Sequence, residues 1–200
     1  MKPFRHAWVL GWAIPPRWFQ PLAAAAFPGV KHTLVCPTPK SWEQLEQPGI
    51  PFDRVWGYSL GSQILLSDPG RAASLGPVSL LAPIWTFPAE AEQGGRVPRA
   101  QLRALSRAFR LNPVEALTGF YANAGLDISA EPCAVEAGEW GLEQLARTAL
   151  LMALPDGWQA WCGDADALLD AERLQALVPS LHRVPGATHH PRALLAAASS

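Results

Sequence analysis

The residue in this sequence best suited to covalent chemistry is a serine framed by two glycines. Residues 57–61 read Gly-Tyr-Ser-Leu-Gly, which matches the pattern G-x-S-x-G with Ser59 at its centre. The apolar run before the motif predicts a buried strand, and the run after it predicts a helix. In that context the motif presents its serine hydroxyl as a nucleophile on a sharp turn, where the glycines leave room. The helix N-terminus would favour the negative charge that develops when a carbonyl is attacked.

A nucleophilic serine needs a general base, and the base needs an acid that orients it. The loop after a predicted strand at 157–162 contains Asp164 and Asp166. Carboxyl ends of parallel strands meet at one edge of a sheet, so this loop should lie near Ser59. Asp166 is favoured as the acid because the loop needs a few residues past the strand to turn back. Asp164 remains the alternative.

The base is expected in the loop that follows the last predicted strand, at 181–185. This loop contains His189 and His190. We favour His189, because His190 directly precedes Pro191 and is expected at the start of a helix. The sequence thus predicts a triad of serine, aspartate and histidine, in that order along the chain.

Attack on a carbonyl also needs N–H donors for the oxyanion. One donor should be the backbone N–H of Leu60, directly after the nucleophile. The other should come from the loop after the first strand, where Gly11 and Trp12 stand. We expect the backbone N–H of Trp12 to be this donor and its indole to line the acyl site.

These residues need a sheet of parallel strands to bring them together. The sequence predicts strands at 6–10, 31–36, 53–58, 77–83, 157–162 and 181–185, and helices at 17–26, 41–47, 60–67 and from 191 onward. Strands that alternate with helices form a parallel sheet covered on both faces, and right-handed crossovers make it doubly wound. The predicted fold is therefore α/β, with about six mostly parallel strands.

A long segment without strand signals separates the fourth predicted strand from the fifth. It predicts helices at 97–111, 113–124 and 139–153. Because it is too long for a plain crossover, we interpret residues 85–153 as an inserted helical lid. Residues 1–84 and 154–200 then form the core.

Composition narrows the class of protein. The formal net charge of −1 argues against nucleic-acid binding, and hydrophobic residues make up 49% of the chain. The three cysteines lack metal-ligand or redox spacing, which fits a reducing cytosol. Glycine and proline interrupt the first apolar run too early for a signal peptide or a membrane helix. A cytoplasmic protein without membrane contact is therefore expected.

With these residues placed, the chain resembles the α/β-hydrolase family along nearly its whole length. Within that family it looks most like the pimeloyl-acyl-carrier-protein methyl ester carboxylesterases of biotin synthesis. The residues that carry this likeness are Leu10-Gly11-Trp12, Tyr58 before the serine, Gly119-Phe120-Tyr121 and Gly141-Leu142-Glu143-Gln144-Leu145. The resemblance implies an esterase that needs no metal or organic cofactor. It also implies an acyl-enzyme on Ser59 and an acidic acyl carrier protein as partner. We expect the protein to be a monomer.

Aromatic side chains are expected to line the acyl site, and they are Trp12, Tyr58, Trp85, Phe109 and Phe120. Other functional interpretations of the same motifs remain open. They are a short-chain esterase, a thioesterase, a menaquinone-pathway enzyme, or a catalytically dead acyl-binding protein on the same scaffold.

A row of arginines in the predicted lid is the other notable charge pattern. Arg99, Arg103 and Arg107 repeat every four residues and Arg110 follows, so the four share one helix face. Like charges at this spacing repel, and the neighbouring sequence offers no acid between them. We therefore expect this face to bind the acidic carrier protein.

Overall fold

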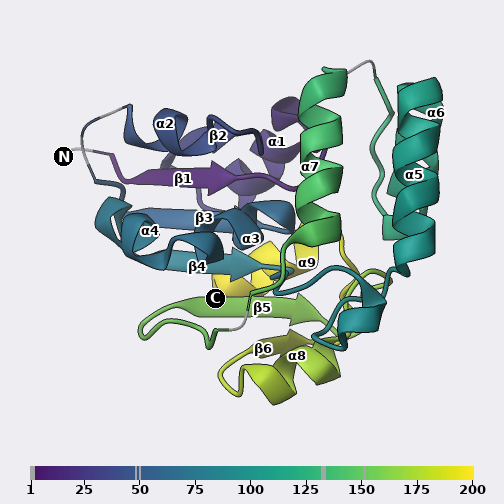
Figure 1. The fold of residues 1–200 in the computed structure, drawn as a ribbon. Helices are drawn as coiled ribbons and strands as arrows, with labels where there is room; N and C mark the ends of the chain where they lie inside the picture. The colour runs from purple at the N-terminus through teal and green to yellow at the C-terminus, as the bar shows by residue number, and fades with distance from the viewer. Residues whose placement is uncertain (1–2, 48, 50, 132–133, 151) are drawn as a thin grey trace.

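The computed structural model describes residues 3–47, 49, 51–131, 134–150 and 152–200. Within them the chain forms a six-stranded sheet in the order β2-β1-β3-β4-β5-β6, and every neighbouring pair is parallel. The strands are β1 (Arg5–Val9), β2 (Lys31–Val35), β3 (Arg54–Tyr58), β4 (Val78–Leu81), β5 (Gln159–Gly163) and β6 (His182–Val184). The predicted parallel, doubly wound sheet is thus present (Figure 1).

Helices cover both faces of this sheet. They are α1 (Pro16–Ala26), α2 (Ser41–Glu46), α3 (Leu60–Ser67), α4 (Pro69–Leu75), α8 (Ala171–Leu177) and α9 (Pro191–Ala198). Helices α1 and α9 pack against each other behind the sheet in Figure 1, whereas α3 and α4 lie in front of it. No helix in the described part of the chain is long and apolar enough to cross a membrane.

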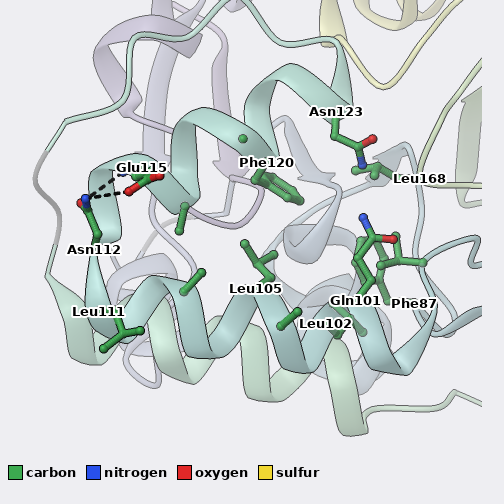
Figure 2. Close-up of a pocket in the computed structure, with 15 residues that line it drawn as sticks. Phe87, Gln101, Leu102, Leu105, Leu111, Asn112, Glu115, Phe120, Asn123 and Leu168 are labelled. Atoms are coloured by element: carbon green, nitrogen blue, oxygen red, sulfur yellow. Dashed lines mark hydrogen bonds between the residues drawn. The ribbon is translucent and has the colours of Figure 1, made fainter.

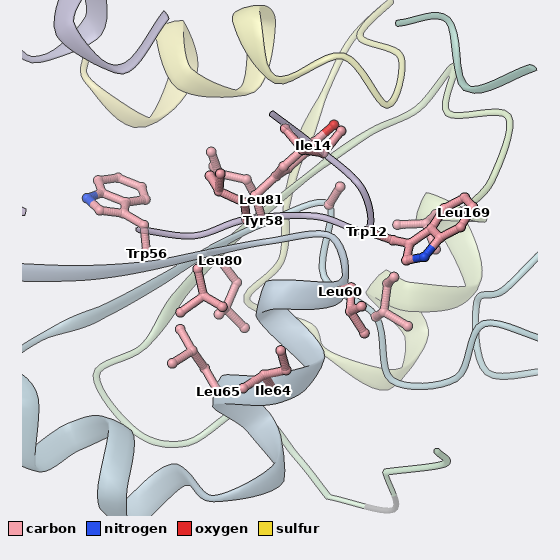
Figure 3. Close-up of a cluster of buried hydrophobic side chains, with 14 of the residues drawn as sticks. Trp12, Ile14, Trp56, Tyr58, Leu60, Ile64, Leu65, Leu80, Leu81 and Leu169 are labelled. Carbon is pink, nitrogen blue, oxygen red and sulfur yellow. The ribbon is translucent and has the colours of Figure 1, made fainter. Parts of the chain in front are cut away.

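The central strands are buried on both faces, which explains why their sequences read as nearly continuous apolar runs. In β1 the side chains of Ala7, Trp8 and Val9 are completely buried. The indole rings of Trp8 and Trp56 stack across β1 and β3 with their centroids 4.9 Å apart. Figure 3 shows how side chains of β3, α3 and β4 meet in this core.

Two helices were not predicted, and each begins with an aspartate cap. The Asp68 carboxylate accepts a hydrogen bond from the Arg71 N–H at the start of α4. The Asp170 carboxylate does the same for the Arg173 N–H at the start of α8. Side-chain caps of this kind satisfy backbone donors that a helix end leaves free. They are the signal that could have indicated both helices.

The long segment between β4 and β5 carries α5 (Arg99–Leu111), α6 (Pro113–Ala124), α7 (Val135–Arg147) and a short 3₁₀ turn, η1 (Ala89–Ala91). The three helices stand together beside the carboxyl edge of the sheet (Figure 1). The third was predicted at 139–153, which is wrong at both ends. After Arg147 the chain turns extended, because the Leu150 N–H donates to the Trp85 carbonyl and Ala149 pairs with Thr86.

Candidate active site

Ser59 lies on a strained turn between β3 and α3. Its backbone has a φ of 53° and a ψ of −119°, a conformation that residues other than glycine rarely adopt. The turn is too tight for a side chain at either glycine of the motif. A Cβ on Gly57 would lie 2.7 Å from the Ser62 Cα, and one on Gly61 would lie 1.9 Å from the Val9 carbonyl oxygen. The two glycines of the motif are therefore required by space.

The imidazole of His189 connects Ser59 to Asp166. Its Nε2 lies 3.0 Å from the Ser59 Oγ, and its Nδ1 lies 2.8 Å from the Asp166 Oδ2. All three side chains are buried. An ionised carboxylate only accepts hydrogen bonds, so this network assigns the proton to Nδ1 and leaves Nε2 to accept from the serine hydroxyl.

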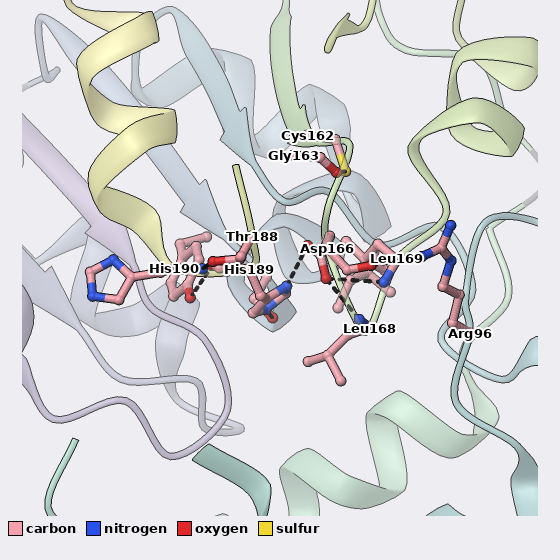
Figure 4. A network of polar contacts seen from close by, with 12 residues as sticks. Arg96, Cys162, Gly163, Asp166, Leu168, Leu169, Thr188, His189 and His190 are labelled. Carbon is pink, nitrogen blue, oxygen red and sulfur yellow. Dashed lines mark hydrogen bonds and ion pairs between the residues drawn. The ribbon is translucent and has the colours of Figure 1, made fainter. Parts of the chain in front are cut away.

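Backbone donors hold the carboxylate of Asp166 in place. Its Oδ1 accepts hydrogen bonds from the N–H groups of Leu168, at 2.8 Å, and Leu169, at 3.1 Å. The other oxygen, Oδ2, faces His189, as Figure 4 shows. Each oxygen therefore has its own partners, and the carboxylate cannot rotate without losing them.

The two alternative residues have other partners. The Asp164 Oδ1 accepts from the Gly186 N–H at 2.7 Å, at an exposed position. The His190 Nε2 lies 3.0 Å from the Asp127 Oδ1, while its Nδ1 accepts from the Arg192 N–H at the start of α9. The fold thus brings Asp166 and His189 to Ser59 and directs Asp164 and His190 elsewhere.

The two expected oxyanion donors flank the serine. Leu60 is the first residue of α3, and a Cβ on Gly11 would lie 3.1 Å from the Ser59 Cβ. No described residue accepts a hydrogen bond from the backbone N–H of Leu60 or of Trp12.

An open groove of 480 Å³ runs between α5 and α6 (Figure 2). Its middle is apolar and includes Leu102 and Leu105, while a hydrogen-bonded pair, Asn112 and Glu115, closes one end. Phe120 lines the groove and packs edge-on against the indole of Trp12, with ring centroids 4.7 Å apart.

The other end of the groove approaches the triad without including it. Leu168 lines this end, and its N–H binds the Asp166 carboxylate. Ser59 and His189 themselves do not line the groove. A second cavity, of 350 Å³, lies on the other side of α6 and is lined by Trp12, Tyr121 and Gly138.

The aromatic residues expected around the acyl site divide into two groups. Trp12 and Phe120 line the cavities described above. Tyr58, Trp85 and Phe109 are buried and line neither. The indole N–H of Trp85 donates to the Met152 carbonyl at 2.8 Å.

The arginine face of α5 meets acidic residues of α7. The Arg110 guanidinium pairs with the Glu139 carboxylate, and a groove between the two helices is lined by Arg99, Arg103, Glu136 and Glu139. The repulsion along α5 is therefore partly offset by acids of another helix. Because the acids lie 26 or more positions further along the chain, spacing within α5 could not reveal them.

The sequence did not predict two hydrogen bonds that other side chains make to backbone carbonyls of the triad residues. The Tyr58 hydroxyl donates to the His189 carbonyl oxygen at 2.9 Å. The Arg96 Nη1 donates to the Asp166 carbonyl oxygen at 2.9 Å, on the far side of the loop in Figure 4. Burial, with the charge of Asp166 as a smaller cause, raises the pKa of Tyr58 well above its ordinary value.

No cluster of three histidine, cysteine or acidic side chains that could hold a metal ion occurs among the residues described. The site brings together a hydroxyl, an imidazole and a carboxylate. Such a set can carry out acyl transfer by proton movement alone.

Comparison with known proteins shows the fold. No protein-family model matches the sequence, and no curated protein matches it. Among solved structures, an esterase from Exiguobacterium antarcticum is similar, with a TM-score of 0.67 and 13% identity over 94% of this chain and 86% of that one.

Two further structures are similar over comparable lengths. The epoxide hydrolase of Bacillus megaterium has a TM-score of 0.62 and 12% identity over 96% of this chain and 88% of that one. BioG from Haemophilus influenzae has a TM-score of 0.54 and 14% identity over 94% and 89%. Together with the parallel six-stranded sheet, these likenesses show that the chain has the α/β-hydrolase fold.

Proposed function

We propose that this protein is a serine hydrolase that cleaves carboxylic esters through an acyl-enzyme. One observation carries the proposal: the His189 imidazole lies between the Ser59 Oγ, at 3.0 Å, and the Asp166 Oδ2, at 2.8 Å. A hydroxyl held this way can lose its proton to Nε2 as it attacks, while the carboxylate stabilises the imidazolium. A fold neighbour named as an esterase agrees with this chemistry.

The reaction proceeds in two steps, acylation of Ser59 and hydrolysis of the acyl-enzyme, and the first step begins with attack on the ester. The Ser59 Oγ bonds to the ester carbonyl carbon while its proton passes to the His189 Nε2. The N–H groups of Leu60 and Trp12 bind the oxyanion. The carbon–alkoxy bond then breaks, and the same proton leaves with the alcohol.

Water completes the cycle. His189 takes a proton from a water molecule that attacks the acyl-enzyme, and a second tetrahedral intermediate forms. Its collapse returns that proton to Ser59 and releases the acid. The residues of the chain supply every proton transfer in this scheme.

For the substrate, we propose an acyl chain carried by an acidic carrier protein, namely the methyl ester of a pimeloyl-type chain. The groove between α5 and α6 supports this class, because its apolar middle and polar ends suit a methylene chain that ends in a polar group. The exposed arginines of α5, three of which line the separate groove between α5 and α7, suit an acidic partner. The resemblance carried by Leu10-Gly11-Trp12 and Gly119-Phe120-Tyr121 supports a methyl ester as the bond that is cleaved.

Replacement of the nucleophile tests the reaction class. Ser59→Ala should lower kcat for an aryl ester by roughly 10⁴- to 10⁶-fold and abolish labelling by a fluorophosphonate probe. Ser67→Ala is the matched control, since it removes an exposed hydroxyl from the end of the same helix. It should label and turn over like the wild type.

The outcomes separate the candidate functions. Equal labelling of the wild type and Ser59→Ala would rule out a serine hydrolase. Wild-type protein that binds acyl chains but neither labels nor turns over would indicate the non-catalytic acyl-binding protein. Faster hydrolysis of free short-chain esters than of the carrier-bound methyl ester would favour a general esterase.

A further inference from the structure

Tyr58, which directly precedes the proposed nucleophile Ser59, forms a hydrogen bond with His189. It is the last residue of β3, directly before Ser59, and its side chain is completely buried. Its hydroxyl donates to the backbone carbonyl oxygen of His189 at 2.9 Å, across 131 positions of the sequence. Two consecutive residues therefore bind His189: Ser59 contacts the imidazole ring of His189, and Tyr58 binds the backbone carbonyl of His189.

The surroundings of the phenol keep it in this role. Its ring packs against Phe19 of α1 and against the His189 imidazole, with centroids 5.6 Å away in each case. Because burial and the Asp166 charge hold the pKa of Tyr58 well above its usual value, the hydroxyl stays protonated and keeps the hydrogen that it donates to this carbonyl. At such buried groups water does not readily replace a lost partner.

The backbone of His189 is the part that the Tyr58 hydroxyl binds. It lies in a short loop between β6 and α9, in which Gly186 adopts a φ of 68°. The contacts with Ser59 and Asp166 fix the rotation of the imidazole, but they do not fix the backbone that carries it. Other hydrogen bonds hold this loop at Gly186 and Ala187, and the bond from Tyr58, which starts from a central strand of the sheet, holds the His189 carbonyl itself.

We propose that Tyr58 is a positioning residue that sets the place of the His189 imidazole relative to the Ser59 Oγ. The inference rests on the proposed hydrolase function. It assigns to Tyr58 a role in the chemical step instead of a place in the wall of the acyl site. A small displacement of a general base has a large effect on rate, because proton transfer requires hydrogen-bond distance.

Tyr58→Phe tests this role, since it keeps the ring and its packing on Phe19 and removes only the hydroxyl. We expect kcat for an aryl ester to fall about tenfold, which is what loss of one buried hydrogen bond produces if it is realised in the transition state. KM should stay unchanged, because the hydroxyl faces a backbone carbonyl and not a cavity. The rate of inactivation by a fluorophosphonate should fall in parallel.

Ser41→Ala is the matched control. It also removes a buried hydroxyl that donates to a backbone carbonyl, that of Thr38 at 2.7 Å. None of its hydrogen bonds reaches a triad residue. Its melting temperature should fall, while kcat stays at the wild-type value.

Active-site titration with the fluorophosphonate expresses each kcat per reactive site, so partial unfolding of a variant does not obscure the comparison. An unchanged kcat per site in Tyr58→Phe would overturn the proposal. So would a raised KM with unchanged kcat, which would place the hydroxyl against the substrate. If the proposed hydrolase function is itself wrong, the Ser59→Ala variant will hydrolyse the ester as fast as the wild type, and this result is distinct from any result with Tyr58→Phe.

Discussion

The indole N–H of Trp12 donates a hydrogen bond to the backbone carbonyl of Gly138 at 2.8 Å, across 126 positions of the chain. This bond ties the loop that carries the proposed oxyanion donor, the Trp12 N–H, to α7. The helix can come this close because it has glycines on the facing side. A Cβ on Gly141 would lie 2.5 Å from the Trp12 Cδ1, and one on Gly138 would lie 2.2 Å from the Phe109 Cζ.

Gly141→Ala should therefore disturb the oxyanion loop. The added methyl group has no room, so Trp12 or α7 must move, and we expect kcat for an aryl ester to fall on the order of tenfold or more. Gly70→Ala is the control, because a Cβ there meets nothing within 4 Å in α4, far from this contact in the chain. It should raise the free energy of unfolding by about 0.5–1 kcal/mol. Equal behaviour of the two variants would contradict the close contact.

The paired acids give a second prediction. Asp166→Asn should lower kcat by on the order of 10³-fold or more, because an amide can donate to Nδ1 and so favours the wrong tautomer of His189. Asp164→Asn should change kcat less than about threefold, since its side chain accepts a single exposed hydrogen bond from the Gly186 N–H. Steady-state kinetics on one aryl ester measures both. The reverse order would mean that the loop adopts another arrangement during catalysis.

The triad geometry could be predicted because each part leaves a local signal. The serine lies in a motif whose glycines are required by space, and the acid and base follow the ends of strands that share one edge. The contacts of Tyr58 and Arg96 leave no such signal. Each joins a side chain to a backbone carbonyl, 131 or 70 positions away, and no pattern of residue types marks a carbonyl.

The sequence also could not show which large apolar side chains line a cavity and which are packed in the interior. Phe109 and Phe120 both lie on amphipathic helices, yet Phe109 fills space above Gly138 while Phe120 faces an open groove. Hydrophobicity predicts burial, but it does not distinguish a packed ring from one that lines a cavity. The same holds for Trp85, whose indole binds the Met152 carbonyl.

The buried His6, which lies beside the half-buried His32, predicts how stability depends on pH. The His6 Nδ1 accepts a hydrogen bond from the Trp56 indole at 3.2 Å. Burial, aided by His32 and Arg54 and opposed by Asp53, lowers the pKa of His6 from 6.5 to about 4. The unfolded chain therefore binds more protons between these values, and the free energy of unfolding should decrease as pH falls from 6.5 to 4. The decrease from His6 is about 3 kcal/mol at most.

Urea unfolding at several pH values checks this slope. His6→Gln keeps an acceptor for Trp56 but cannot take up a proton, so its stability should depend less on pH in that window. The pKa of His32 is also lowered, mainly by burial, so part of the slope should remain. His182→Gln, at an exposed position on β6, serves as the control and should keep the wild-type slope. Identical slopes in all three proteins would exclude His6 as the cause.

The arginines of α5 give the last prediction, and the structure narrows it to two of them. Arg110 is paired with Glu139, so its charge is already partly compensated. Arg103 and Arg107 are exposed, and no acidic side chain among the described residues forms an ion pair with either. Changing both to Glu should raise KM for a carrier-bound ester at least tenfold, because an acidic partner would then be repelled. KM for a small uncharged aryl ester should barely change.

Lys31→Glu with Arg183→Glu is the matched control, because it makes the same change in net charge at exposed positions on the edge strands β2 and β6. It should leave KM for both substrates near the wild-type values. Binding of the carrier to the wild type should also weaken with added salt, since exposed charges are screened over about 10 Å at 0.1 M ionic strength. If the α5 variant impairs both substrates equally, the arginines support the helix pair through the acids of α7, and the carrier protein must bind elsewhere or not at all.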